Sequence, residues 1–222
     1  MTTSTPDNIS SLSTRTITVI GASRGTGATT AAMAGALGAS VRAVSRSGGS
    51  PAPGVTTYLG DATDPEAVRA AISGTDAVLL MVGARGRDRS GIRASTTRAV
   101  IDVMHHEGVR RLIVQSSLGL GDSAHRLDFF TKYLVFPLVL GPAMADHAAQ
   151  ESITTASGLD WTIVRPGYLN DGPATGQVVA LPSTSREPMR PRLSRADLAA
   201  WSLGAIDDAA TVNHSVVLGS LQ

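Results

Sequence analysis

The chain has 222 residues, a formal net charge of +1, 42% hydrophobic residues and no cysteine. This length suits one α/β domain with a substantial core. The small net charge gives no electrostatic basis for binding nucleic acid, and the lack of cysteine excludes disulfides, thiol catalysis and thiolate metal sites. No apolar run reaches the roughly 18 residues of a membrane span. We therefore expect a cytoplasmic protein with no metal site, no membrane segment and no nucleic-acid partner.

Residues 1–14 are mostly serine, threonine and other small polar types. They lack the basic start and apolar core of a signal peptide. We predict that they form a disordered tail. The rest of the chain, residues 15–222, has no internal repeat and no linker long enough to divide it, so we predict one domain.

The stretch from Ile17 to Ala36 predicts a strand, a glycine-rich turn and a helix. Its first four residues are mostly apolar and β-branched, as in a buried parallel strand, and its last part is rich in helix-forming residues. The turn Gly21–Gly27 has the spacing G-x-x-x-G-x-G. The first N–H groups of such a helix are unpaired, point at the turn and favour a phosphate. A glycine motif alone is weak evidence, so a tight turn without a ligand is the alternative.

Further along the chain, apolar segments alternate with helical ones. Strands are expected at 41–45, 55–59, 76–82, 111–115, 160–164, 177–181 and 215–218. Helices are expected at 65–72, 90–107, 146–157 and 195–207, with Asp64 and Ser194 as N-terminal caps and Gly108 as a C-terminal cap. Residues 120–145 are expected to form a helical flap, and most of 170–192 an extended loop. This alternation predicts an α/β, doubly wound parallel sheet of the Rossmann type.

Ligands of such sheets bind beyond the carboxyl ends of the strands. Five segments of the chain are expected at that rim: Gly21–Gly27, Ser45–Arg46, Asp61–Ala62, Gly83–Arg85 and Ser116–Ser117. Their convergence predicts a dinucleotide site more strongly than the glycine turn does alone. The C-terminal segment, about 166–222, is then expected on the substrate side of this rim.

The residues after the second strand indicate which dinucleotide binds. NAD sites usually carry an acid there, which holds the ribose 2′-hydroxyl, whereas this chain has Ser45 and Arg46. An arginine binds a 2′-phosphate with a planar set of donors, and Arg24 is near enough in the turn to reach it too. We therefore predict NADP(H); the alternative is that Arg24 and Arg46 are ordinary surface arginines. Asp61 is expected either to meet the adenine edge or to begin the following helix.

With these residues the chain resembles the atypical short-chain dehydrogenase/reductase group. It is most similar there to the NAD(P)H-binding (NmrA-like) family, in the subgroup of biliverdin-IXβ reductase/flavin reductase. The motifs that carry the resemblance are Gly21–Gly27, Gly60–Ala62, Ser116–Ser117, Asp146–His147, Ser157–Gly167, Asp171–Gly176 and Ser194–Leu198. One departure is Arg24, where the flavin reductases usually have glycine; here the glycine falls one place later, at Gly25.

The resemblance implies two sets of site residues. The expected cofactor-binding residues are Gly21, Ser23, Arg24, Gly25, Thr26, Gly27, Ser45, Arg46, Asp61, Ala62, Val82, Gly83, Arg85, Gln115, Ser116, Pro166, Gly167, Tyr168 and Leu169. Ser117 and His147 match positions that line the active site in relatives. Ser117 is expected to bind the nicotinamide amide or the substrate, and His147 to orient the cofactor or relay a proton, because its ordinary pKa is near neutral. The alternatives are that Ser117 satisfies backbone groups and that His147 pairs with Glu151 on an exposed helix face.

The Tyr-x-x-x-Lys dyad of many short-chain dehydrogenases is absent. Lys132 is the only lysine, and Asp128 stands four residues before it. A conjugated acceptor does not need this dyad, because it can take its proton from water while the cofactor carries the difficult step. We predict an NADP(H)-dependent reductase of a flavin, a quinone or an aromatic metabolite, acting as a monomer or small homo-oligomer. The alternatives are a dinucleotide-binding redox sensor and a non-redox isomerase, dehydratase or cyclase on the same scaffold.

Overall fold

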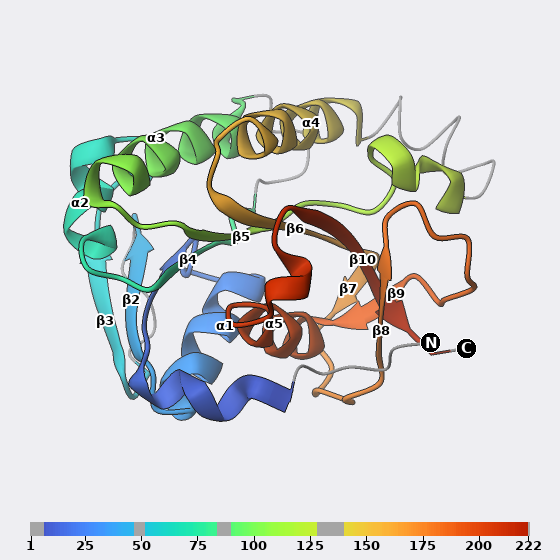
Figure 1. The fold of residues 1–222 in the computed structure, drawn as a ribbon, viewed down its shortest axis with the longest axis horizontal. Helices are drawn as coiled ribbons and strands as arrows, with labels where there is room; N and C mark the ends of the chain where they lie inside the picture. The colour runs from blue at the N-terminus through green and yellow to red at the C-terminus, as the bar shows by residue number, and fades with distance from the viewer. Residues whose placement is uncertain (1–6, 47–51, 84–89, 128–139, 222) are drawn as a thin grey trace.

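The computed structural model describes residues 7–46, 52–83, 90–127 and 140–221. Its centre is an eight-stranded sheet with the order β3-β2-β1-β4-β5-β6-β10-β8 (Figure 1). These strands are β1 (Thr16–Ile20), β2 (Ser40–Ser45), β3 (Val55–Leu59), β4 (Ala77–Leu80), β5 (Arg111–Gln115), β6 (Asp160–Pro166), β8 (Val178–Pro182) and β10 (His214–Ser220). All neighbours are parallel except β8, which pairs antiparallel with β10. The sheet is the predicted doubly wound Rossmann sheet with one antiparallel edge strand.

Helices cover both faces of the sheet (Figure 1). The helices are α1 (Gly25–Ala36), α2 (Pro65–Ile72), α3 (Ile92–Glu107), α4 (Gly141–Thr155) and α5 (Arg195–Gly204). On one face α1 packs against α5, and on the other α3 packs against both α2 and α4. In the described residues no helix has the length and apolar character needed to cross a bilayer.

Strand β1 explains why both faces are covered. Its side chains alternate, so that Ile17 and Val19 join the apolar cluster under α1 and α5, whereas Ile20 joins the cluster under α2 and α3. Thr18, on the second face, is buried and donates its hydroxyl to the carbonyl of Ala71 in α2. A strand with two buried faces needs apolar residues on both, as is usual for the centre of a parallel sheet.

The predicted disordered tail is wrong for the part that the structure describes. Asp7–Thr14 forms a short 3-10 helix, η1, that lies against α5. Leu12 is 1% exposed within the core, and the Ser11 hydroxyl donates to Asp207 Oδ2 at 2.6 Å. Two apolar residues, Ile9 and Leu12, are too weak a signal in a polar segment to predict order, but the burial of Leu12 attaches the segment to the core. Residues 1–6 lie outside the described part.

The predicted flap is described only in part. Gly121–Arg126 is a short 3-10 helix, η2, and residues 128–139 lie outside the description. Helix α4 begins at Gly141, five residues before the expected start at Asp146. The earlier start is compatible with Pro142, which lies in the first turn of α4, where its missing N–H has no helical partner to lose.

The extended loop at 170–192 carries more structure than expected. The predicted strand near 177–181 is confirmed as β8. A second, two-stranded parallel sheet pairs β7 (Tyr168–Asn170) with β9 (Arg192–Ser194), and this pairing was not predicted. Strands of three residues give almost no periodic signal, so only the tertiary contact defines them.

Candidate functional site

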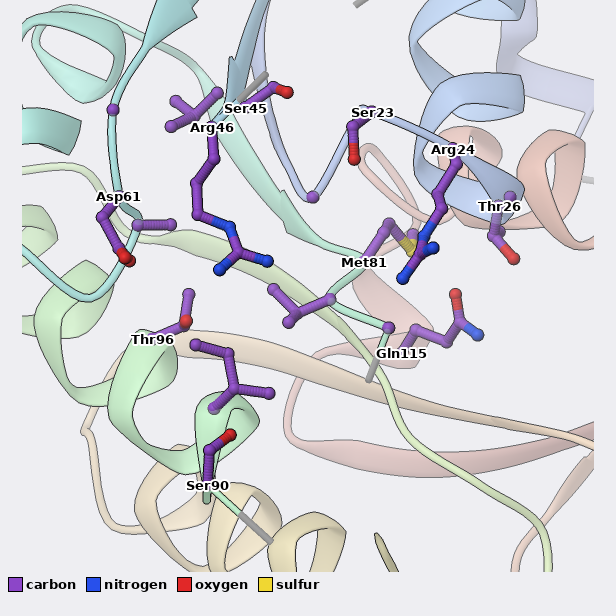
Figure 2. A pocket seen from close by; sticks show the side chains of 18 of the residues that line it. Ser23, Arg24, Thr26, Ser45, Arg46, Asp61, Met81, Ser90, Thr96 and Gln115 are labelled. Carbon is purple, nitrogen blue, oxygen red and sulfur yellow. The ribbon is translucent and has the colours of Figure 1, made fainter. Parts of the chain in front are cut away.

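A pocket of about 1120 Å³ lies at the carboxyl ends of the parallel strands (Figure 2). It joins the β1–α1 turn, the ends of β2 to β5, the start of α3, strand β7 and the first residue of α5. Its wall consists of Gly21, Ser23, Arg24, Gly25, Thr26, Val44, Ser45, Arg46, Gly60, Asp61, Ala62, Met81, Val82, Gly83, Ser90, Ile92, Thr96, Gln115, Leu169 and Arg195. Four of the five segments predicted at this rim therefore contribute to the pocket, whereas Ser116–Ser117 does not line it.

The glycines of the β1–α1 turn have different physical roles. Gly21 has φ +88°, and a Cβ there would lie 2.8 Å from the carbonyl oxygen of Met81. A Cβ on Gly27 would lie 2.3 Å from the carbonyl oxygen of Gly21, so α1 packs directly on the turn. Gly25 has φ +57°, and a Cβ there would meet only Nε of Arg195, at an ordinary 3.7 Å, so glycine is needed here for its backbone conformation. Arg24 precedes α1 and makes no capping hydrogen bond with its side chain, which leaves the first N–H groups facing the pocket.

Two arginines enter the pocket near the turn. Figure 2 shows Arg24 extending from the start of α1, on the side of Thr26, and Arg46 from the end of β2, on the side of Asp61; both line the pocket. Asp61 faces Arg46 across this end of the pocket. Its carboxylate accepts hydrogen bonds from Thr63, at 3.0 Å from the backbone nitrogen and 2.8 Å from the hydroxyl. The backbone bond of Thr63 is the main cause that lowers the pKa of Asp61, and the charge of Arg46 adds to it.

Both interpretations of Asp61 are therefore compatible with one geometry. It lines the pocket, and its bonds to Thr63 also shape the turn that leads into α2. Asp64, not Asp61, caps that helix, accepting from the backbone nitrogen of Glu66 at 3.0 Å, as predicted.

The other end of the pocket is less charged. Met81, Val82 and Gly83 follow β4, and Leu169 comes from β7. Gln115, the last residue of β5, projects into the pocket, and its side-chain oxygen is buried without a hydrogen-bond partner in the described residues (Figure 2). A buried acceptor without a partner is costly, so this atom fits a donor supplied by a ligand. The pocket thus has a cationic end and a weakly polar end, as a dinucleotide requires.

Residues 21–209 match the sequence profile of a family described as NAD(P)H-binding. The chain belongs to this NAD(P)H-binding family. The family-level resemblance seen in the sequence motifs is therefore confirmed.

Individual relatives agree with this membership. An anaerobillin reductase, ChuY, from Escherichia coli O157:H7 is 29% identical; the alignment covers 92% of this chain and 97% of that one, with a TM-score of 0.72. A short-chain dehydrogenase/reductase from Veillonella parvula, solved with NADP, has a TM-score of 0.76 over 93% and 94% of the two chains, and at 18% identity it supports the fold only. An uncharacterised sugar epimerase, YhfK, from Bacillus subtilis is 29% identical over 160 residues, which cover 68% of this chain and 66% of that protein. The match thus spans just under two thirds of that relative.

Most of the predicted cofactor residues of this NAD(P)H-binding protein meet in the pocket. The exceptions among the described residues are Gly27, Ser116, Pro166, Gly167 and Tyr168. Gly27 packs beneath the turn, Ser116 is buried, and Tyr168 is 61% exposed next to the pocket-lining Leu169. Arg85 lies outside the described residues.

The pocket also includes residues that we did not predict: Val44, Gly60, Met81, Ser90, Ile92, Thr96 and Arg195. Val44 and Met81 immediately precede predicted positions at strand ends, and Gly60 belongs to a motif that carried the family resemblance. Ser90, Ile92 and Thr96 lie at the start of the predicted helix 90–107, a position that could have indicated them. Arg195 also belongs to a motif that carried the resemblance, Ser194–Leu198, but we interpreted that motif as the start of a helix and not as part of the pocket.

Neither proposed catalytic side chain is part of the pocket wall in the described chain. Ser117 lies two residues beyond the end of β5, and its hydroxyl donates to the carbonyl of Leu118 at 3.3 Å. This contact is the backbone-satisfying alternative for Ser117, although a hydroxyl with one long bond is free to rotate toward a ligand.

His147 lies on α4 in a polar cluster between α3 and α4. Its Nδ1 is 3.2 Å from the side-chain oxygen of Gln150, and Glu151 pairs instead with Arg165. The neighbouring Asp146 accepts from the backbone nitrogens of Arg93 and Ala94 at the start of α3, so it caps that helix from outside. The alternative in which His147 pairs with Glu151 on an exposed helix face is therefore wrong.

The near-neutral pKa assumed for His147 is also wrong. Burial, with the charge of Arg93, lowers the pKa of His147 to about 4, so its imidazole is neutral at pH 7. In the unfolded chain the pKa returns to the ordinary value of about 6.5. Below that pH the unfolded state therefore binds a proton that the folded state resists, and folding weakens as the pH falls.

We predict that this difference lowers the free energy of unfolding by about 2 kcal/mol between pH 7 and pH 5. Urea denaturation at both pH values measures it. His147→Gln keeps a hydrogen-bonding side chain and should remove most of the loss. His106→Gln, at a side chain that is 69% exposed, is the matched control and should keep the wild-type profile. An unchanged profile in His147→Gln would contradict the assignment.

Proposed function

We propose that this protein is an NADP(H)-dependent reductase of a conjugated acceptor, such as a flavin, a quinone or an aromatic or polycyclic metabolite. The observation that carries the cofactor choice is Arg46 at the end of β2, where NAD sites carry an acid, with Arg24 lining the same pocket from the start of α1. The similarity to a reductase over nearly the whole of both chains supports the reaction class.

Each part of the pocket has a proposed role toward the cofactor. The uncapped start of α1, with Ser23 and Thr26, binds the diphosphate through backbone and hydroxyl donors. Ser45, Arg24 and Arg46 bind the 2′-phosphate. Asp61 and Ala62 border the adenine. Val82, Gly83 and Gln115 border the nicotinamide half, where the unpartnered oxygen of Gln115 accepts a hydrogen bond. When bound, NADPH supplies the hydride.

The proton can come from solvent, which is why the missing Tyr-x-x-x-Lys dyad is compatible with this reaction. We assign Ser117 to hydrogen bonding with the nicotinamide amide or the acceptor. We assign His147 to orientation, because a neutral imidazole with a pKa of about 4 is not an effective proton donor at pH 7. Ser116, Pro166, Gly167, Tyr168 and Arg85 stay predictions for the nicotinamide side of the site.

The test is oxidation of NADPH and of NADH, followed by absorbance, with FMN, riboflavin and a simple quinone as acceptors. We expect turnover with at least one acceptor and a preference for NADPH of about tenfold or more. Ser117→Ala should lower kcat more than it raises KM if the hydroxyl acts on the reacting groups. Preference for NADH would contradict the cofactor assignment.

Tight NADPH binding without turnover would contradict the reductase proposal. It would favour the dinucleotide sensor or the non-redox enzyme. The similarity to a protein named as a sugar epimerase makes the non-redox alternative worth testing directly. A nucleotide that remains bound in one oxidation state while a substrate is converted would identify that case.

A further inference from the structure

Arg195 reaches the glycine turn from the opposite end of the sequence. It is the first residue of α5, directly after the capping residue Ser194, and its side chain lines the pocket. The packing of α5 against α1 brings the starts of both helices together. As a result, the Nε atom of Arg195 lies 3.7 Å from where a Cβ on Gly25 would be.

The guanidinium group of Arg195 is held on one side. Its Nη1 donates to Oδ1 of Asp171 at 2.7 Å. In the described residues Asp171 is the only hydrogen-bond partner of this side chain. The N–H groups of Nε and Nη2 therefore donate to no described residue. Nε is the atom that faces the turn at Gly25. The free edge of the guanidinium group is therefore available to a ligand in the pocket.

The loop that carries Asp171 is itself fixed to α5. Asp197 is 2% exposed, and its Oδ1 accepts from the backbone nitrogens of Thr175 at 2.8 Å and Gly176 at 3.0 Å. Its Oδ2 also accepts from the hydroxyl of Ser194 at 2.8 Å. Because this network orders both the loop and the start of α5, Arg195 loses less conformational freedom when it binds an anion.

We propose that Arg195 binds the diphosphate bridge of the dinucleotide, an inference that rests on the proposed function. The start of α1 supplies partial positive charge to this part of the pocket, and Arg195 adds a full charge from the α5 side. Arg24 enters from the start of α1 and Arg46 from the end of β2 (Figure 2). Arg195 is thus a cofactor-affinity residue that the glycine motif does not contain.

The test compares Arg195→Ala with the wild type on three probes by fluorescence titration. NADPH and 2′-phospho-ADP-ribose both carry the diphosphate bridge, whereas adenosine 2′-monophosphate has neither phosphate of that bridge. We expect Arg195→Ala to weaken the binding of the first two probes by about tenfold or more and the binding of the third by less than about twofold. Arg195→Lys keeps the charge but loses the planar set of donors, so its affinity for NADPH should lie between those of the wild type and Arg195→Ala.

The matched control is Arg192→Ala. Arg192 lies three residues earlier, on β9, is exposed and does not line the pocket. The Arg192→Ala variant should bind all three probes with the affinity of the wild type. Thermal unfolding of each variant checks that folding is intact, and Arg195→Lys keeps the test valid if Arg195→Ala unfolds.

Three results would overturn the inference. Unchanged NADPH affinity in Arg195→Ala would show that no contact exists. An equal loss for all three probes would mean that Arg195 acts through a general field or through structure. A loss of affinity for NADPH alone would indicate that Arg195 contacts the nicotinamide half of the cofactor. Failure of the wild type to bind NADPH is a separate outcome and would contradict the proposed function itself.

Discussion

The double variant Arg24→Ala/Arg46→Ala is expected to bind NADPH about 100-fold more weakly and to bind NADH within about threefold of the wild type. The two cofactors differ only in the 2′-phosphate, and both arginines enter the pocket where that phosphate is proposed to lie (Figure 2). An exposed guanidinium–phosphate contact contributes about 1.5 kcal/mol, at the low end for charged hydrogen bonds, so two contribute about 3 kcal/mol. Fluorescence titration with both cofactors measures the change.

The control for this variant must remove the same charge elsewhere. Arg98→Ala/Arg192→Ala removes two exposed arginines that do not line the pocket, so it separates a local contact from the general field of the protein. It should keep the preference for NADPH. If the pocket variant weakens NADPH and NADH equally, the two arginines do not select for the 2′-phosphate.

Gly27→Ala is expected to lower the free energy of unfolding by about 3 kcal/mol and to abolish NADPH binding. The added Cβ would lie 2.3 Å from the carbonyl oxygen of Gly21 and 3.2 Å from Cα of Ala22. Both are backbone atoms of the turn, so no side-chain rotation can relieve the clash. Helix α1 must therefore move away from the turn that is proposed to hold the diphosphate. Urea denaturation and NADPH titration measure the two effects.

Gly83→Ala is the matched control for Gly27→Ala. Gly83 also lies at the pocket, but no atom of the described residues is within 4 Å of where its Cβ would be, and its φ is outside the left-handed region. The free energy of unfolding of Gly83→Ala should differ from that of the wild type by less than about 0.5 kcal/mol. Wild-type stability and NADPH affinity in Gly27→Ala would mean that the close packing at this turn is not required.

The sequence determined the fold because its signals are local. The apolar runs predicted β3 and β5 with their observed bounds, and the capping roles of Asp64 and Ser194 are confirmed. The glycine spacing predicted the β1–α1 turn. Since parallel strands end at one rim, the order of strands and helices also predicted most of the pocket without any knowledge of side-chain contacts.

Tertiary structure decided what depends on contacts between distant segments. The interaction of Leu12 with the core orders a segment that its composition describes as a tail, and the environment of α3 and α4 lowers the pKa of His147. Arg195 reaches Gly25 only because α5 packs on α1. Composition and periodicity report what one residue prefers among its sequence neighbours. The burial of a side chain, its electrostatic environment and the site that it contacts depend on residues from elsewhere in the chain. The sequence therefore determined where the pocket forms, and the packing determined which distant side chains enter it.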